Sequence, residues 1–308
     1  MQLVIIILRQ ILTMALYMLT GFLLYKTQKI SDQGSKSIAN ILVWLVIPFT
    51  IINSFRVDYS GEQLIRFLVS FVVGLLAIII SMIVSRIIFG SDPINCFGAS
   101  FSNAGFIGIP LIQESLGDSA VFLIVGMIVG LNILQWTYGI GLLVGNSQKL
   151  DIKHMFLNPI IIGSLIGFVI FLCGRGDNLP SVIGNFISGV AALNAPLAML
   201  VLGVYLGKTS IKSLFITKKL YFVSMVRLLL IPVITIAVLN LLPIDNTLKM
   251  AILIAASAPA GANVAVYSQV YDNDYPYACM VVAHSSIFSI ITLFLGIIKF
   301  LKLIVVKA

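Results

Sequence analysis

Long apolar runs separated by short polar stretches account for most of the 308 residues. A helix needs about 20 predominantly apolar residues to cross the hydrocarbon core of a bilayer. The pattern therefore predicts an all-α polytopic membrane protein with ten transmembrane helices. The ten predicted spans cover 3–25, 37–55, 64–89, 94–113, 119–144, 156–174, 179–207, 214–242, 247–271 and 277–301.

The two halves of the chain repeat a pattern of glycine and proline. The longest polar stretch, 146–154, lies at the middle and separates five predicted spans from five. Because each half holds an odd number of spans, the halves must cross the membrane in opposite directions, as inverted repeats do. We expect a first repeat over 1–145, a central cytoplasmic loop over 146–155 and a second repeat over 156–308. The matching pairs are 19–25 with 165–171 (offset 146), Pro48 with Pro196 (offset 148) and Pro110 with Pro259 (offset 149).

Spans four and nine contain residues that interrupt a helix. Span four carries Gly105, Gly108 and Pro110, and span nine carries Pro259 and Gly261. Glycine costs about 1 kcal/mol and proline about 3 kcal/mol in a helix interior. Unpaired backbone in lipid survives only where protein or a water-filled cavity covers it. Breaks at matching positions of two halves indicate a transporter substrate site, and kinks at tight helix contacts are the alternative.

The breaks favour an anionic ligand. Each interruption exposes the N-terminus of a half-helix, whose free N–H groups and positive dipole end attract an anion. Asn103 and Asn263 stand beside the two breaks and offer amide groups without a fixed charge. All eleven acidic residues fall in loops or at span ends, which leaves no mid-membrane carboxylate to bind a cation or a proton. Na⁺ stays open as a coupling ion, because carbonyls and amides can coordinate it.

Other polar residues inside the predicted spans allow two interpretations each. Arg227 would either snorkel to the membrane surface or pair with a loop carboxylate or carbonyls, or it would balance the substrate charge. His284 would either pack with a hydrogen bond or relay a proton. Asn132, Gln135 and Asn194 would either bond across helices or line the substrate cavity. The three cysteines follow no metal-site spacing, and we expect neither a metal nor a cofactor.

Composition narrows the function classes. Hydrophobic residues make up 60% of the chain and charged residues 10%, against roughly 25% charged in a soluble domain. A soluble enzyme, a disordered chain and a nucleic-acid-binding domain are therefore excluded. The sequence carries no nucleotide-binding, metallohydrolase or serine-hydrolase motif, so we expect neither an enzyme nor an ATP-driven pump.

The basic residues, which give a net charge of +8, set the expected orientation. Cytoplasmic loops of membrane proteins carry more Lys and Arg than outer loops do. With the N-terminus outside, the inner loops hold ten of these residues and the outer loops hold four. We therefore expect both termini on the outer side of the cell membrane, although the basic residues of the two tails oppose this count.

Several motifs together resemble the auxin efflux carrier family, which covers plant auxin carriers and bacterial organic-acid permeases. The resemblance runs along the whole chain. The motifs are SNAGFIGIP at 102–110, APAGANVAVYSQVYDND at 258–274, NP at 158–159, APLAMLVLG at 195–203 and RLLLIP at 227–232.

The resemblance implies ten spans in inverted repeats, with broken helices four and nine crossing each other. It also implies a scaffold of spans 1, 2, 6 and 7 and a moving transport domain of spans 3–5 and 8–10, which would carry an organic anion by an elevator-type mechanism. Asn103 stands where an asparagine contacts the substrate carboxylate in plant members. A homodimer through the scaffold helices is a further expectation.

The leading hypothesis is secondary transport of a small organic anion, either a dicarboxylate such as malate or malonate or a hydrophobic weak acid. A Na⁺-coupled symporter of the bile-acid type is one alternative, and Na⁺-dependent uptake would identify it. A sensor with the transporter fold is the other, and it would bind a ligand without accumulating it in liposomes.

Single cysteines placed between Gln148 and His154 of a cysteine-free variant should react only with reagents applied from the cytoplasm. The reason is the excess of Lys and Arg in the loops on that side. Labelling with a membrane-impermeant maleimide measures the side, and a reaction in intact cells would invert the predicted orientation.

Overall fold

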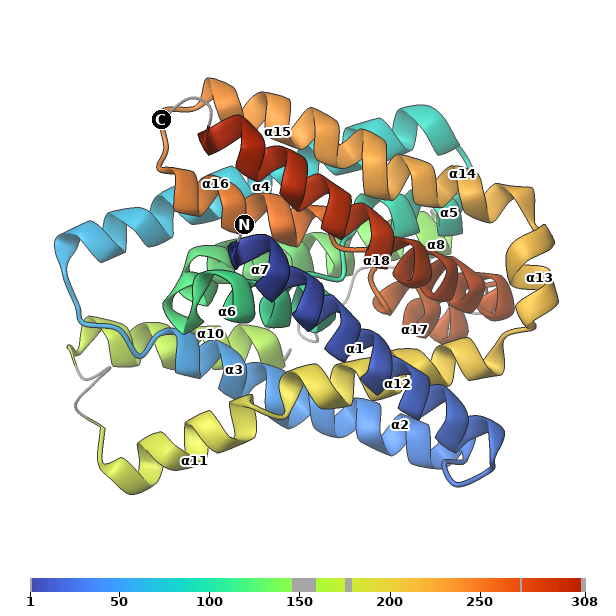
Figure 1. Ribbon diagram of the computed structural model, residues 1–308, viewed down its shortest axis with the longest axis horizontal. Coiled ribbons are helices and arrows are strands. Elements are labelled where there is room, and N and C mark those ends of the chain that lie inside the picture. Colours follow the sequence, from blue (N-terminus) through green and yellow to red (C-terminus); the bar gives the residue numbers. More distant parts are fainter. Residues whose placement is uncertain (1, 146–158, 175–178, 272, 306–308) are drawn as a thin grey trace.

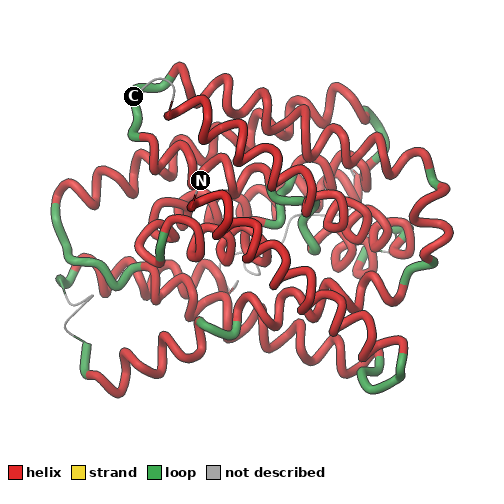
Figure 2. Tube along the Cα trace, viewed as in Figure 1, coloured by secondary structure: helices red, strands yellow, loops and turns green. Residues whose placement is uncertain are grey.

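The computed structural model of the protein describes residues 2–145, 159–174, 179–271 and 273–305. Figures 1 and 2 show that helices make up most of this part of the chain and that short turns join them. The described residues form no strand, which confirms the all-α class. The predicted central loop, 146–155, lies outside the described residues.

The helical segments follow the predicted spans, and polar side chains cap several of them. The Ser60 hydroxyl accepts a hydrogen bond from the Gln63 N–H at the start of α4, and Asp92 caps α5 in the same way. In chain order the segments are α1 (Gln2–Lys26), α2 (Asp32–Ile41), η1 (Leu42–Val46), α3 (Ile47–Ser54), α4 (Gly61–Phe89), α5 (Pro93–Ser100), η2 (Ala104–Gly108), α6 (Ile109–Leu116), η3 (Asp118–Val121), α7 (Phe122–Leu134), η4 (Gln135–Gly139), α8 (Ile140–Val144), α10 (Pro159–Leu172), α11 (Ser181–Ala191), α12 (Asn194–Lys208), α13 (Ile211–Ile216), α14 (Lys218–Met225), η6 (Val226–Leu230), α15 (Ile231–Leu241), α16 (Asn246–Ser257), α17 (Asn263–Val270) and α18 (Tyr275–Val305).

The length and apolar composition of its helices identify this chain as a polytopic membrane protein. Shorter apolar helices cover Leu12–Lys26, Pro159–Leu172 and Asn246–Ser257. The total of ten spans and the inverted repeat stay predictions. In the described residues, six helical stretches are long and apolar enough to cross a membrane: Asp32–Ser54, Gly61–Phe89, Ser119–Val144, Ser181–Lys208, Lys218–Leu241 and Tyr275–Thr292.

Prolines shape the helices in two ways that the sequence pattern did not predict. Pro48, Pro110 and Pro232 each follow a five-residue π-helical segment. Proline lacks an N–H and its ring clashes with the carbonyl four residues earlier, so the preceding turn widens. The predicted span 179–207 is also divided between α11 and α12 at Ala192 and Leu193. Pro196 explains that break, because Ala192 is the residue whose carbonyl its ring would meet.

Two groups of helices are visible in Figure 1, and α1 crosses α12, a helix of the lower group. Helices α2, α3, α10, α11 and α12 occupy the lower part of the view, and α4, α14, α15 and α16 occupy the upper part. Glycines allow the close crossing of α1 and α12. A methyl group on Gly203 would overlap the carbonyl of Met18, and one on Gly21 would overlap the backbone of Leu200. Such small residues are typical of helix contacts in membranes.

Replacing Gly203 by alanine should destabilise the protein, because the new methyl group has no space against α1. We expect a loss of about 1–3 kcal/mol in the free energy of unfolding, the usual cost of overpacking. Thermal denaturation in detergent measures it. Gly189→Ala on α11 is the control, since nothing lies within 4 Å of the added methyl group. Equal stability of the two variants would contradict the proposed packing of α1 on α12.

Candidate substrate-binding site

Two interruptions of the helices meet inside the molecule. One lies between α5 and η2 and the other between α16 and α17, and they pair as a short antiparallel bridge. The Asn103 N–H donates to the Pro259 carbonyl over 2.7 Å, and the Gly261 N–H donates to the Phe101 carbonyl over 2.9 Å. Each break therefore supplies hydrogen-bond partners for the other, which a membrane interior requires.

A glycine and a serine complete this crossing. A methyl group on Gly261 would lie 3.3 Å from the Ser102 carbonyl oxygen. The two interrupted segments approach each other this closely because Gly261 has no side chain. The Ala260 N–H donates to the Ser285 hydroxyl over 3.1 Å. Helix α18 therefore supports the crossing from the side.

Asn103 caps the half-helix that begins at the first break. Its side-chain oxygen accepts from the Phe106 N–H over 3.3 Å, and its carbonyl accepts from the N–H groups of Ile107 and Gly108. The residue is only 5% exposed. Its amide nitrogen has no hydrogen-bond partner in the described part of the chain. A buried donor without a partner is costly, so this nitrogen is available to a ligand.

A cavity of about 550 Å³ adjoins the crossing. Its described lining contains no charged side chain and only a few polar ones. The polar side chains are Asn40, Ser102, Asn103, Asn132, Gln135 and Asn263, and the larger apolar and aromatic ones are Val43, Trp44, Ile47, Phe106, Ile128, Leu131, Trp136, Ile160, Val266 and Tyr267.

Some of the polar groups beside the cavity are paired with each other or with the backbone. The Asn263 amide donates to the Gln135 side-chain oxygen over 2.6 Å, and the Asn132 amide donates to the Ile128 carbonyl over 2.8 Å. The indole N–H of Trp136 is buried and, among the described residues, has no partner, like the amide nitrogen of Asn103. These two groups are donors, so they suit a ligand with acceptor oxygens. The side-chain oxygen of Asn194, whose amide reaches Gly105, is a buried acceptor that also has no partner among the described residues.

Six of the twelve predicted site residues line this cavity: Asn103, Gly105, Asn132, Gln135, Gly261 and Asn263. Sequence reasoning missed Trp44, Trp136 and Asn40. The signal for Trp136 was its position next to Gln135, but the pattern of an apolar span does not say which face carries a cavity.

The other six predicted residues do not line the cavity. Gly108 packs against Ala255, and the Asn194 amide reaches the Gly105 carbonyl at 3.4 Å. Pro110 is buried within α6, while the Pro259 carbonyl belongs to the bridge described above.

His284 and Arg227 contact parts of the protein away from the cavity lining. The His284 Nδ1 atom lies 2.7 Å from the Ser224 hydroxyl, and its ring stacks on Phe288. Arg227 donates to three backbone carbonyls at the ends of α5 and α16. The carbonyl partner that the sequence allowed for Arg227 is therefore present.

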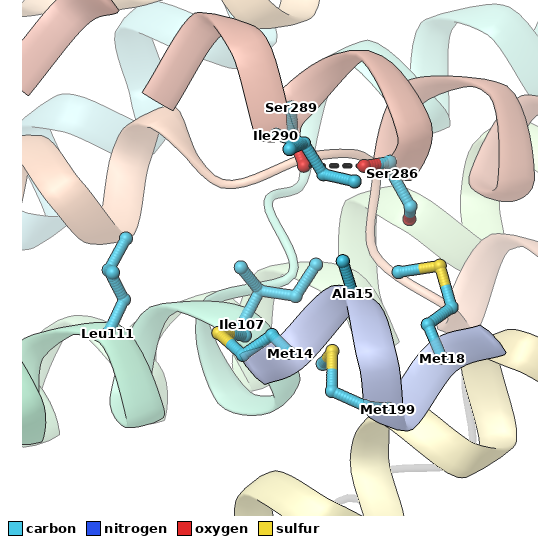
Figure 3. A pocket seen from close by; sticks show the side chains of 9 residues that line it. All are labelled: Met14, Ala15, Met18, Ile107, Leu111, Met199, Ser286, Ser289 and Ile290. Atoms are coloured by element: carbon cyan, nitrogen blue, oxygen red, sulfur yellow. Dashed lines mark hydrogen bonds between the residues drawn. The ribbon is translucent and has the colours of Figure 1, made fainter. Parts of the chain in front are cut away.

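A second cavity, of about 20 Å³, lies between α1 and α12 on one side and η2, α6 and α18 on the other. Figure 3 shows Met14 and Met18 from α1, Met199 from α12 and Ser286 from α18 around it. This volume holds about one water molecule and is too small for an organic substrate.

A helical membrane protein with two interrupted helices beside a polar-edged cavity has the features of a secondary transporter. The sequence profile of the family described as "Membrane transport protein" matches residues 6–297. The chain therefore belongs to this family, the auxin efflux carrier family that its motifs resemble. It is also 22% identical, over 276 residues, to a protein named as an uncharacterized transporter from Methanocaldococcus jannaschii. The match covers 86% of this chain and 89% of that relative.

Proposed function

We propose that the protein carries a small organic anion across the membrane by elevator-type alternating access. The buried amide nitrogen of Asn103, without a described partner, carries this proposal. It stands at the N-terminus of a half-helix and beside a cavity whose described lining has no charge. A carboxylate there would gain the amide donor and the positive end of the helix dipole, whereas a cation would meet no carboxylate in the described lining.

The lining favours one of the two substrate kinds expected from the sequence. A second carboxylate of a dicarboxylate would find no cationic side chain among the described lining residues, and burying it unpaired would be costly. A hydrophobic weak acid matches better, because Trp44, Trp136 and Tyr267 offer broad apolar faces to its body. The volume of about 550 Å³ lies in the usual range for small-molecule sites.

The repeat and domain organisation are part of the proposal: ten spans, with repeats over 1–145 and 156–308. Matched glycines support the inverted repeat. Gly21 of span one packs on α12 of span seven, and Gly167 of span six packs on Phe55 of span two. A twofold relation between the halves would produce this exchange of partners.

In the proposed elevator mechanism, α1, α2, α3, α10, α11 and α12 form a fixed scaffold. The transport domain contains both broken helices and moves against this scaffold. The 20 Å³ cavity lies on the boundary between these groups. Met14, Met18 and Met199 cover the scaffold side of it. Methionine side chains are flexible and apolar, which suits a surface that slides without breaking directional bonds.

Replacing Asn103 by alanine should weaken substrate binding roughly 10- to 100-fold, the loss of one hydrogen bond to a charged group. Asn103→Asp should weaken it further, because it sets a negative charge against the carboxylate. A thermal-shift screen of monocarboxylates with apolar bodies and of dicarboxylates finds the ligand, and titration gives the affinities. Asn185→Ala on the exposed face of α11 is the matched control. Undiminished anion binding by Asn103→Asp would place the site elsewhere.

Structures trapped in opposite-facing states should show the crossing of the broken helices at different heights relative to α3 and α12. The reason is that the proposed transport domain moves as a unit while the scaffold stays fixed in the bilayer. Cryo-electron microscopy with and without ligand measures the height. A crossing that keeps its height while gates open on either side would refute the elevator mechanism and leave the anion site intact.

A further inference from the structure

Arg227 is a buried cation inside an apolar helix of the second half. It lies in η6, is 1% exposed, and makes no ion pair with a described carboxylate. Its three donors all go to backbone carbonyls: Nε to Ala258 over 3.0 Å, Nη1 to Ala99 over 2.9 Å, and Nη2 to Ala256. An isolated charge at this depth costs several kcal/mol, so these carbonyls must provide its compensation.

The three carbonyls belong to the ends of the two interrupted helices. Ala99 is in the last turn of α5, and Ala256 and Ala258 are at the end of α16. Such carbonyls have no partner inside their own helix and carry the negative end of its dipole. In transporters with broken helices, carbonyls of this kind coordinate the coupling cation. The guanidinium group of Arg227 thus lies where a bound Na⁺ would otherwise find its ligands.

Charge balance at the crossing agrees with this placement. Each helix end carries roughly half an elementary charge, so the two C-terminal ends amount to roughly one negative charge. Arg227 supplies one positive charge to those ends. The two half-helix N-termini, which begin at Ala104 and Asn263, then keep roughly one positive charge for the ligand. This remaining positive charge would balance the single negative charge of one carboxylate.

We propose that Arg227 is a built-in cation that replaces the coupling ion at the crossing, so that anion binding and transport need no Na⁺. This rests on the carrier function proposed above and adds to it the coupling mode and the single charge of the substrate. Arg227 acts as a positioning residue: it holds the ends of α5 and α16 together and leaves the N-termini to the substrate.

Cation dependence of the purified, substrate-free protein tests the proposal. Melting temperatures of wild type and Arg227→Met are compared in chloride salts of N-methylglucamine, sodium and guanidinium at equal ionic strength. We expect wild type to melt alike in the sodium and N-methylglucamine salts. Arg227→Met should melt about 5–10 °C lower, because three buried carbonyls lose their donor. Guanidinium, at concentrations far below those that denature, should restore at least half of that loss by occupying the vacated place.

Arg66→Met is the matched control, because Arg66 is exposed and pairs only with Glu62 in the described structure. Guanidinium should not raise its melting temperature. A saturable, Na⁺-specific stabilisation of wild type would overturn the proposal, and this arm decides even if Arg227→Met does not fold. A folded Arg227→Met that guanidinium fails to stabilise would overturn it as well. Because no substrate is present, a negative result here would leave the anion site at Asn103 untouched. In the same way, a failure of anion binding at Asn103 would leave the result for Arg227 untouched.

Discussion

A peptide group inside a bilayer has no water to bond, so every break in a membrane helix needs compensation from the protein itself. In this protein two breaks compensate each other. The backbone N–H groups of Asn103 and Gly261 each donate to a carbonyl of the other interrupted segment. The Ser285 hydroxyl accepts from the Ala260 N–H. Arg227 donates to three carbonyls that the helix ends leave over. With these groups satisfied, the amide nitrogen of Asn103 and the indole nitrogen of Trp136 remain as buried donors that have no partner among the described residues.

Under the proposed function, these donors and the half-helix N-termini would let an uncharged cavity select for an anion. The described lining holds no ionised side chain, and Arg227, which lies outside that lining, donates to carbonyls at the ends of α5 and α16. The field of the half-helix N-termini is therefore not opposed locally. Fixed dipoles in an apolar surrounding act strongly at short range, because little water screens them. A weak acid would be held by its carboxylate at the crossing and by aromatic faces along its body.

Sequence patterns located the breaks because glycine and proline act on the backbone wherever they occur. The positions of Asn103, Gly261 and Asn263 at the crossing could be predicted on that basis. The π-helical turns before Pro48 and Pro232 and the division between α11 and α12 were not predicted, because apolar length alone does not reveal how a helix accommodates a proline. Trp136 was missed for a related reason: an aromatic residue in an apolar span looks the same facing lipid, core or cavity.

The sequence by itself determined that this protein belongs in a lipid bilayer, that it is helical and where its helices are interrupted. These properties depend on local composition and backbone chemistry. Only the tertiary structure decided the partners. Arg227 could have paired with a loop carboxylate or the substrate, and it donates instead to Ala99, 128 residues away. Asn263 likewise pairs with Gln135, again 128 residues away. Helical periodicity gives the face of each side chain, but contacts at such separation depend on how the helices pack, and the packing fixes which donors stay free for a ligand.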